Sequence, residues 1–462
     1  MSAPGGKRPT KFDYDLVIIG SGAGGGVAAH MAVNRGKKVA IIEEEKIGGE
    51  CPNFGCVPTK ALLRAAELYH DASEVAPTFG VNATNVSVNM QSVKKWKDLA
   101  VKRTGTGAGD RAFAAEGIAV IKGHAHFISP WEVSTGDKRV TSKHFIIATG
   151  TKDFIPPIEG LKSAGFITYR KAINMTKLPK SMLVIGGGAI GTEFSHLFNR
   201  LGVEITQVEY APRLLAREEP EASELIQALF ERDGINVVTG GEVYKVEKDR
   251  AKKVVHVRQG DELHTFRVDE ILLAAGKTPN VDLGLDNAGV EYTKRGIVTN
   301  KMMQTSRKHI YAAGDVVGPY AFTHMASYQS RIAAHNILHR QKIEASYHAV
   351  PRCTFTEPEV ASVGVTEAEA RDKGWRIKIN AVPISIIGRA NTSNQSAGFV
   401  KVVTSQTGVL LGGTVVAPRA GEMMQEIALA VQNGLKAQDV AATIHAFPTW
   451  SEAIRIACAG IK

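Results

Sequence analysis

Short apolar runs recur along the chain, and most of them end in a glycine-rich turn. Residues 15–20 read DLVIIG, residues 144–150 read HFIIATG and residues 271–280 read ILLAAGKTPN. Runs of this length without polar alternation indicate strands that are buried on both faces, as in a parallel sheet covered by helices. The pattern therefore predicts an α/β fold.

The first run leads into glycines at the spacing G-x-G-x-x-G, which are Gly20, Gly22 and Gly25. A helix is expected over residues 24–35, and the next strand, residues 38–42, ends in Glu43. Glycines permit a tight turn and let backbone N–H groups approach a pyrophosphate, and an acidic strand end suits an adenosine ribose. These residues predict a dinucleotide site.

The same arrangement occurs a second time, at Gly186, Gly188 and Gly191. Here the acidic strand end is Glu209, in the sequence ITQVE. A carboxylate can bond a ribose 2′-hydroxyl and repels a 2′-phosphate, so we expect NADH rather than NADPH. Arg213 and Arg217 follow closely and could weaken that preference. Two such units in one chain predict two different dinucleotides.

Residues 48–60 read GGECPNFGCVPTK and carry two of the four cysteines, Cys51 and Cys56. In an ideal helix this pair would lie roughly 7.5 Å apart along the axis, beyond the reach of a disulfide, so a bond requires a distorted backbone. Pro52 and Gly55 could supply the distortion. We interpret the pair as a redox-active disulfide. Two unpaired core cysteines or half a metal site are the alternatives, and without a second cysteine pair we expect no metal.

This segment resembles the GG-x-C-x-N-x-G-C-x-P-x-K signature of the flavoprotein disulfide reductases, the class I pyridine nucleotide-disulfide oxidoreductases. The resemblance implies FAD in the first unit, with Cys51 as the thiol that meets the substrate and Cys56 as the thiolate beside the flavin. It also implies that Lys60 lies near the flavin and pairs with Glu193. Further FAD-binding positions are implied at Thr149, Gly150, Gly314 and Asp315, in segments that resemble the family's ATG and GD signatures. Gly276, in the strand that marks the return to the FAD domain, is expected to be a further cofactor-binding position.

The resemblance covers nearly the whole chain and implies two Rossmann-like dinucleotide-binding domains, for FAD and NAD, plus a C-terminal α+β dimerisation domain. We expect the FAD domain at residues 1–151 and 277–346, the NAD(P) domain at 152–276 and the dimerisation domain at 347–462. Within the first part, residues 85–115 are expected to form a long helix. A homodimer is implied, in which each active site takes residues from the partner's C-terminal segment.

One position departs from the family pattern. Disulfide-reducing members carry H-x-H-P-T-x-x-E, whose second histidine is the acid/base and whose glutamate orients it. Here residues 445–452 read HAFPTWSE, so Phe447 replaces the acid/base while His445 and Glu452 are retained. A positioned base contributes about 10²- to 10⁴-fold to a rate, so this change bears on the substrate.

We therefore predict an FAD-dependent NAD(P)H:disulfide oxidoreductase of the dihydrolipoamide dehydrogenase type, acting on a small or protein-bound disulfide. Phe447 keeps a second prediction open, a mercuric reductase-like enzyme that reduces a metal ion or another non-disulfide acceptor. Cys458 invites comparison with the C-terminal thiols of such enzymes, but it has no neighbouring cysteine, so we expect it, like Cys353, to be a buried small residue.

The charge and composition of the chain limit the kinds of partner that it can be expected to bind. The net charge is +10, but the basic residues are scattered, which argues against nucleic acid. No run of about 18 apolar residues occurs, so no membrane span is expected, and no signal peptide is recognised; we expect a cytoplasmic protein. A basic surface could also meet an acidic segment of a multienzyme complex, in which the chain would serve as a docking subunit.

Overall fold

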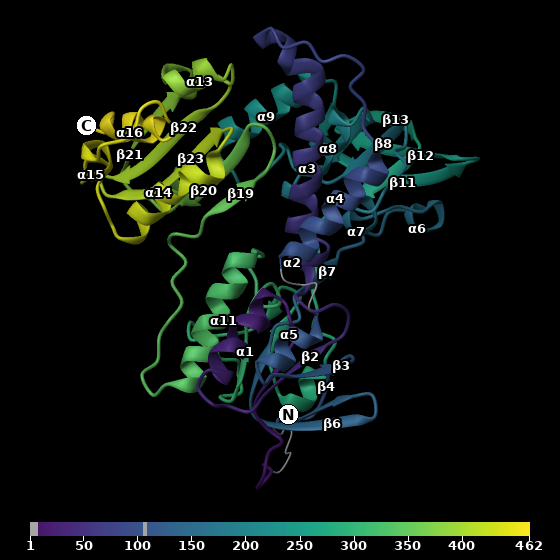
Figure 1. The fold of residues 1–462 in the computed structure, drawn as a ribbon, viewed down its shortest axis with the longest axis vertical. Helices are drawn as coiled ribbons and strands as arrows, with labels where there is room; N and C mark the ends of the chain where they lie inside the picture. The colour runs from purple at the N-terminus through teal and green to yellow at the C-terminus, as the bar shows by residue number, and fades with distance from the viewer. Residues whose placement is uncertain (1–7, 105–108) are drawn as a thin grey trace. The chain divides into compact units, whose positions relative to one another are not determined.

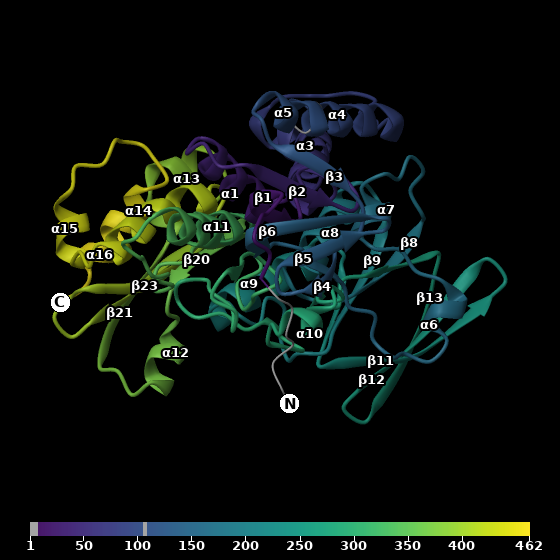
Figure 2. The ribbon, with the colours of Figure 1, turned by 90° about the horizontal axis from the view of Figure 1, so that it is seen from below.

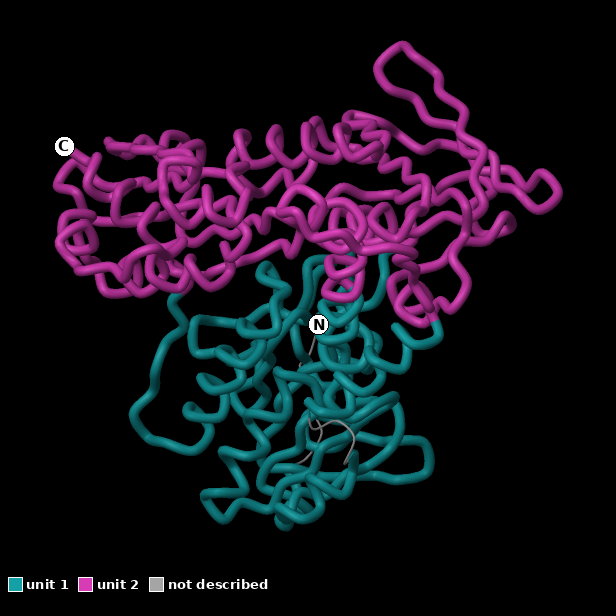
Figure 3. Tube along the Cα trace, turned by 45° about the horizontal axis from the view of Figure 1, so that its top comes forward, with its two compact units in different colours: residues 1–62, 91–154, 276–346 teal, residues 63–90, 155–275, 347–462 magenta. Residues whose placement is uncertain are grey.

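The computed structural model describes residues 8–104 and 109–462. The chain forms two compact units, each assembled from segments that are far apart in the sequence (Figure 3). The first unit comprises residues 1–62, 91–154 and 276–346, and the second comprises residues 63–90, 155–275 and 347–462. Each unit has its own sheets and its own buried core, and each is described separately below.

The first unit is built on one mixed sheet (Figure 1). Its strands are β1 Tyr14–Ile19, β2 Val39–Glu43, β3 Ala119–Lys122, β4 His126–Ser129, β5 Glu132–Thr135, β6 Lys138–Ile147 and β18 Ile310–Ala312. Smaller pairs are β7 Thr151–Asp153 with β15 Lys277–Pro279, and β16 Tyr292–Thr293 with β17 Gly296–Ile297. The helices are α1 Ala23–Val33, α2 Glu50–Asn53, α4 Met90–Arg103, α5 Asp110–Ala115, α10 Leu285–Ala288 and α11 Thr323–Leu338, with the start of α3 Cys56–His70.

The centre of this sheet is parallel, in the order β3-β2-β1-β6, with β18 beside β6. Every residue of β2 and the last four of β1 are buried, as the continuous apolar runs predict. Helices α1 and α11 are in contact with each other and lie side by side in both ribbon views (Figures 1 and 2). The carboxyl end of β1 leads directly into the start of α1, and this edge of a parallel sheet is where nucleotides bind.

The second unit contains a four-stranded parallel sheet in the order β10-β9-β8-β14, followed by a three-stranded antiparallel meander, β11-β12-β13. These strands are β8 Ser181–Ile185, β9 Glu204–Glu209, β10 Asn236–Thr239, β11 Gly241–Asp249, β12 Lys252–Gln259, β13 Glu262–Val268 and β14 Glu270–Leu273. The helices of this part are α6 Leu161–Ala164, α7 Tyr169–Ala172, α8 Ala189–Arg200 and α9 Pro220–Arg232, and the end of α3 runs into short turns at Asp71–Val75 and Ala76–Phe79.

The C-terminal part of the second unit is a five-stranded antiparallel sheet in the order β19-β20-β23-β22-β21. Its strands are β19 Arg352–Thr354, β20 Glu359–Gly364, β21 Ile377–Pro383, β22 Phe399–Ser405 and β23 Leu410–Ala417. The helices are α12 Glu367–Asp372, a short turn at Ile384–Ile386, α13 Gly388–Thr392, α14 Ala420–Gln432, α15 Ala437–Ala442 and α16 Glu452–Ala459.

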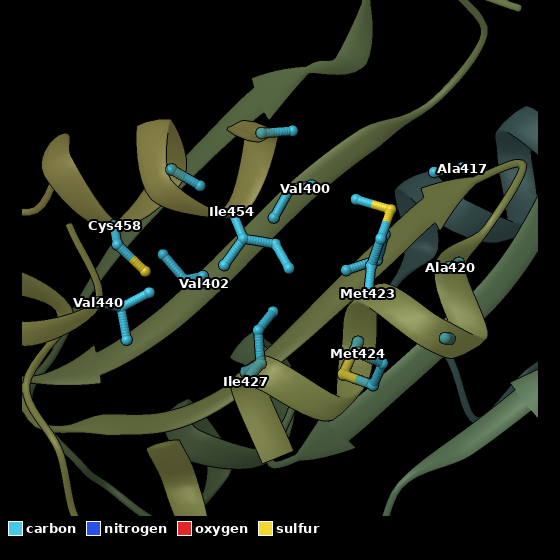
Figure 4. Packing of buried hydrophobic residues seen from close by; sticks show 14 of the residues in the cluster. Val400, Val402, Ala417, Ala420, Met423, Met424, Ile427, Val440, Ile454 and Cys458 are labelled. Atoms are coloured by element: carbon cyan, nitrogen blue, oxygen red, sulfur yellow. The ribbon is translucent and has the colours of Figure 1, made fainter. Parts of the chain in front are cut away.

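A buried apolar core lies between this sheet and its helices. Figure 4 shows Val402 of β22 with Ile427 of α14, and Ile454 and Cys458 of α16, in one buried cluster. Cys458 is fully buried, and burial raises the pKa of its thiol to about 12. Its expected role as a buried small residue is confirmed. Cys353 is only half-buried.

The expected long helix over residues 85–115 is wrong in its extent. Helix α4 begins at Met90, because residues 85–89 are irregular and Asn85 has a left-handed φ of 57°. Asparagine tolerates that conformation, and its side chain competes with helix hydrogen bonds. A second helix, α5, covers residues 110–115, and residues 105–108 of the expected helix lie outside the described residues. Among the helices described, none is long and apolar enough to cross a membrane.

Candidate active site

The first glycine-rich turn brings α1 directly onto the end of β1. A Cβ added at Gly25 would lie 1.9 Å from the carbonyl oxygen of Gly20, and Gly20 itself has a φ of 101°. At Gly22, by contrast, an added Cβ would meet no atom closer than 3.8 Å. Gly20 and Gly25 are thus required for packing, whereas the backbone at Gly22 stays accessible to a phosphate group.

Glu43 closes this turn. Its carboxylate accepts hydrogen bonds from the backbone N–H of Ser21, at 2.9 Å, and from the Ser21 hydroxyl, at 2.6 Å. The Ser21 hydroxyl also accepts a bond from the backbone N–H of Gly48, at 3.0 Å. A Cβ added at Gly49 would lie 2.7 Å from Cα of Gly22, so the two loops touch. Ser21, which lies inside the glycine motif, therefore links the expected ribose carboxylate to the cysteine segment.

The cysteine segment is a broken helix. Helix α2 ends at Asn53 and α3 begins at Cys56, so the break falls at Phe54 and Gly55, between the two cysteines. This is the distortion that the spacing requires. The Asn53 side-chain amide donates to the carbonyl oxygens of Ile47 and Gly49, at 2.9 and 2.8 Å, and so holds the short helix in place.

The two cysteines differ in environment. Cys56 is exposed and its Sγ lies 3.6 Å from Oγ1 of Thr323, whereas Cys51 is half-buried. A hydrogen bond with Cys56 and burial raise the pKa of the Cys51 thiol. When the reduced pair carries a single proton, that proton is therefore held at Cys51.

The remaining expected cofactor-binding positions of this part of the chain lie in the same unit. Thr149 donates its hydroxyl to the carbonyl oxygen of Asn280, at 2.8 Å, and the N–H of Asn280 donates to Gly150, at 3.0 Å. The N–H of Gly314 donates to the buried side chain of Gln329, at 2.8 Å. Next to it, burial raises the pKa of the Asp315 carboxyl. Gly276, with a φ of 121°, leaves open space where a Cβ would stand.

The second glycine-rich turn repeats the geometry of the first. A Cβ at Gly191 would lie 2.0 Å from the carbonyl oxygen of Gly186, while nothing lies within 4 Å of a Cβ at Gly188. The carboxylate of Glu209 accepts hydrogen bonds from the N–H of Gly187 and from the N–H of Ala211, the latter at 2.6 Å. The second unit therefore holds a dinucleotide-binding turn of the same design.

Glu193 is the fifth residue of α8 and is 5% exposed. Its carboxylate accepts a hydrogen bond from the backbone N–H of Phe355, at 3.0 Å. Lys60 belongs to the other compact unit, on α3, so the expected pairing of Lys60 with Glu193 stays a prediction.

The C-terminal motif presents Phe447 to the surface, with 78% of the residue exposed. Both ring nitrogens of His445 have hydrogen-bond partners in the chain. Its Nε2 lies 2.8 Å from the carboxylate of Glu426, and its Nδ1 lies 2.8 Å from the carbonyl oxygen of Thr443. Glu452 begins α16 and accepts a hydrogen bond from the N–H of Thr449, at 3.3 Å. Within the described part of the second unit, His445, Thr449 and Glu452 of the motif are present, and Phe447 stands where the motif has its second histidine.

Sequence reasoning missed Ser21, Glu426 and Thr323. Ser21 occupies a variable position of the glycine motif, and Glu426 precedes His445 by 19 residues, so neither carries a local signal. Thr323 lies 267 residues from Cys56. Only the folded chain brings these partners together.

Comparison with known proteins gives a consistent family. The chain matches the family described as pyridine nucleotide-disulphide oxidoreductase over residues 14–334, and its dimerisation domain over residues 350–458. A mercuric reductase of Staphylococcus aureus is 34% identical over 448 residues, covering 96% of this chain and 82% of the relative. A dihydrolipoyl dehydrogenase of Thermus scotoductus is 36% identical over 448 residues, covering 96% of each chain.

Solved structures of similar fold include a Cu(II) complex of the HOCl-induced flavoprotein disulfide reductase RclA from Escherichia coli. It has a TM-score of 0.87 and 27% identity, and the match covers 97% of this chain and 99% of that one. LpdA from Mycobacterium tuberculosis has a TM-score of 0.86 and 26% identity, with 96% and 98% covered.

Proposed function

Because the chain belongs to the pyridine nucleotide-disulphide oxidoreductase family and is an FAD-dependent oxidoreductase, we propose that it passes two electrons between NADH and the Cys51–Cys56 pair, and between that pair and an external acceptor. The observation that carries this proposal is the anchoring of the cysteine segment on the first dinucleotide turn. The Ser21 hydroxyl bonds both Glu43 and Gly48, so one polar network joins the ribose carboxylate to the cysteine loop.

The residues of the first unit fit FAD. The open backbone at Gly22 would face the pyrophosphate, Glu43 would accept from the adenosine ribose, and Asp315 would bond a hydroxyl of the ribityl chain. Such a bond would offset the burial that now raises the pKa of Asp315. Bound FAD would accept a hydride from the nicotinamide and supply electrons to the cysteine pair.

The cysteine pair would carry the electrons onward. Reduction of a Cys51–Cys56 disulfide by two electrons with uptake of one proton gives one thiol and one thiolate. The hydrogen bond with Cys56 and burial favour the proton on Cys51. Cys56 is the first residue of α3, where the helix dipole favours negative charge, so we assign the thiolate to Cys56. Cys51 would then exchange with a disulfide acceptor as its thiolate, with its proton passing to the leaving sulfur.

We propose NADH as the coenzyme of the second unit. The Glu209 carboxylate ends β9 beside the glycine turn, where it would accept from a 2′-hydroxyl and repel a 2′-phosphate. The guanidinium of Arg213 donates to the carbonyl oxygens of Ala216 and Glu218, at 3.0 and 3.4 Å, and is therefore engaged within its own loop. This contact supports the NADH assignment.

For the acceptor we propose a disulfide of the lipoamide type. The relative from Thermus scotoductus that covers 96% of both chains is named dihydrolipoyl dehydrogenase. In this chain, the retained residues Thr449 and Glu452 of the family motif are joined by a hydrogen bond from the Thr449 N–H, at 3.3 Å.

The exposed Phe447 favours a second candidate, a thiophilic metal ion. Thiolates bind such a cation directly, and its reduction needs no protonation of a leaving sulfur, so a missing imidazole costs little. Relatives are named mercuric reductase, and the similar RclA structure is described as a Cu(II) complex.

The deciding experiment compares the native protein with Phe447→His and with Phe447→Leu, which removes the ring without adding a base. Dihydrolipoamide-dependent reduction of NAD⁺ and NADH-dependent reduction of Hg(II) and Cu(II) would be measured for each. If the acceptor is a metal ion, only Phe447→His oxidises dihydrolipoamide well, with a gain of about 10²- to 10⁴-fold.

Efficient turnover of dihydrolipoamide by the native enzyme would instead establish the disulfide candidate and show that another base serves it. A purified protein without FAD would refute the whole proposal.

A further inference from the structure

The loop that follows Glu209, residues 210–219, folds back onto the second glycine turn. The N–H of Leu215 donates to the carbonyl oxygen of Gly187, at 2.8 Å. A Cβ added at Gly187 would lie 2.7 Å from the Leu214 side chain. At the far end of β10, the N–H of Gly240 donates to the carbonyl oxygen of Ala211, at 2.8 Å. The 210–219 loop is therefore part of the wall of the expected coenzyme site.

Arg213 is the cation of this loop nearest in sequence to Glu209. Its Nη2 donates to two carbonyl oxygens of the same loop, those of Ala216 and Glu218. Its buried Nε, however, has no hydrogen-bond partner among the described residues. The guanidinium is thus held by few bonds, and an arginine near this strand end is the residue type that accommodates a 2′-phosphate.

The carbonyl of Glu218 is itself held in place from the C-terminal sheet. The Glu218 side chain, 8% exposed, accepts hydrogen bonds from Nε of Arg352 on β19, at 2.7 Å, and from the hydroxyl of Ser362 on β20. Nη2 of Arg352 also donates to the carbonyl oxygen of Arg217, at 3.1 Å. Arg352 therefore binds two consecutive residues of the loop.

A second anchor lies one residue further on. Glu219, 2% exposed, accepts from Nζ of Lys401 on β22, at 3.1 Å, and from the N–H of Glu367, at 2.7 Å. Lys401 Nζ is also 2.8 Å from carboxylate oxygens of Glu221 and Glu367. This anchor fixes the end of the loop independently of Arg352, so loss of Arg352 would loosen Arg217 and Glu218 without detaching the loop.

We propose that Arg352 is a positioning residue for coenzyme selection. By fixing Glu218, it keeps the carbonyl oxygens that engage Arg213 and so withholds Arg213 from a 2′-phosphate. The dimerisation domain thereby sets the preference for NADH through the loop that follows Glu209. This inference rests on the proposed function, in which the second unit binds the nicotinamide coenzyme.

The test measures the anaerobic reduction of the bound flavin by NADH and by NADPH in the FAD-loaded protein, as a ratio of second-order rate constants. This readout needs no terminal acceptor. Arg352→Met is expected to raise the NADPH/NADH ratio about tenfold, since a freed guanidinium would bond the phosphate. Arg213→Met alone should leave the ratio near the native value, and the double variant should lose the gain. Arg352→Lys should recover part of the native selectivity.

An unchanged ratio in Arg352→Met, or a gain that persists in the double variant, would overturn the inference. If Arg352→Met does not fold, Ser362→Ala removes one bond to Glu218 and leaves the ion pair, and it should shift the ratio in the same direction by a smaller factor. No shift there would also count against it. If neither coenzyme reduces the flavin of the native protein, the proposed function itself is refuted. If the native flavin is reduced but the variants leave the NADPH/NADH ratio unchanged, only the inference about Arg352 is refuted.

Discussion

Carboxylates at the strand ends of this protein are stabilised by backbone N–H donors. Glu43 and Glu209 each accept such bonds from the glycine turn beside them. Glu359, on β20, is half-buried, and its carboxylate accepts a hydrogen bond from the N–H of Gly421, at 2.9 Å. Burial raises the pKa of Glu359 to about 7, with Glu422 and Glu67 acting in the same direction and Arg419 and the Gly421 bond opposing.

Glu359 should therefore make stability depend on pH. Between its ordinary pKa of 4.5 and about 7, the folded chain holds a proton that the unfolded chain has released. Raising the pH through this window then favours unfolding, by on the order of 1–3 kcal/mol, and the loss levels off above it. Equilibrium unfolding of the native protein and of Glu359→Gln from pH 4.5 to 8 checks this, because the glutamine keeps an acceptor for Gly421 and should lack the slope. Glu262→Gln, at an exposed site, should keep it.

Among the helices and strands, the same arrangement of strand, glycine turn and helix occurs twice. In each dinucleotide turn, the helix approaches the strand so closely that only glycine fits, at Gly25 and at Gly191. The open positions, Gly22 and Gly188, lie between these contacts and would face the phosphates. Under the proposed function, each turn binds its own dinucleotide, so we expect the two binding functions to be lost independently.

A methyl group at either contact should therefore abolish one coenzyme and spare the other. Gly25→Ala places Cβ 1.9 Å from a carbonyl oxygen and should yield protein depleted of FAD. Gly191→Ala makes the same clash at 2.0 Å and should retain FAD while its reduction by NADH slows at least about tenfold. Flavin absorbance and anaerobic reduction measure the two losses.

The control is Gly26→Ala in α1, where the new Cβ would have only ordinary contacts at 3.8 Å or more. It should be neutral or slightly stabilising, because alanine favours a helix over glycine by about 1 kcal/mol. Equal loss of FAD in Gly26→Ala, or in Gly191→Ala, would contradict the division of roles.

For the whole molecule, the match to the dimerisation domain supports a homodimer. Within that domain, Ile444 is 97% exposed and Phe447 78% exposed in the single chain, and both lie between α15 and α16. Exposed large apolar side chains that lie close together mark interaction surfaces. We expect the partner subunit to cover this loop. Docking into a larger multienzyme complex also stays a prediction.

Ile444→Glu should accordingly weaken the dimer, because a buried unpaired charge is costly at an interface. Sedimentation velocity over a range of concentrations would show monomer where the native protein is dimeric, with activity falling in parallel. The matched control is Leu263→Glu on the β11–β13 meander, also exposed, at 67%, and outside the dimerisation domain. A dimer that tolerates Ile444→Glu would place the interface elsewhere.

The sequence by itself determined the features that depend on local chemistry. Glycines at fixed spacing after an apolar strand predict a nucleotide turn, because absence of a Cβ acts within a few residues. The same holds for the acidic strand ends at Glu43 and Glu209, and for the helix break between Cys51 and Cys56. The α/β class and the family followed from these patterns, and both are confirmed. The long helix over residues 85–115 failed because helical periodicity does not register a local left-handed backbone such as that at Asn85.

The tertiary structure alone decided which side chains work together. Ser21 connects two loops, and His445 bonds Glu426. Arg213 donates to the carbonyl oxygen of Glu218, whose side chain is bonded by Arg352, 134 residues further along the chain from Glu218. Glu426 and Arg352 have no recognisable motif around them, and the motifs that contain Ser21 and His445 do not identify their bonding partners. Their roles depend on contacts between distant segments, whose energies are set by burial and geometry once the sheets have formed, so no local pattern could reveal them.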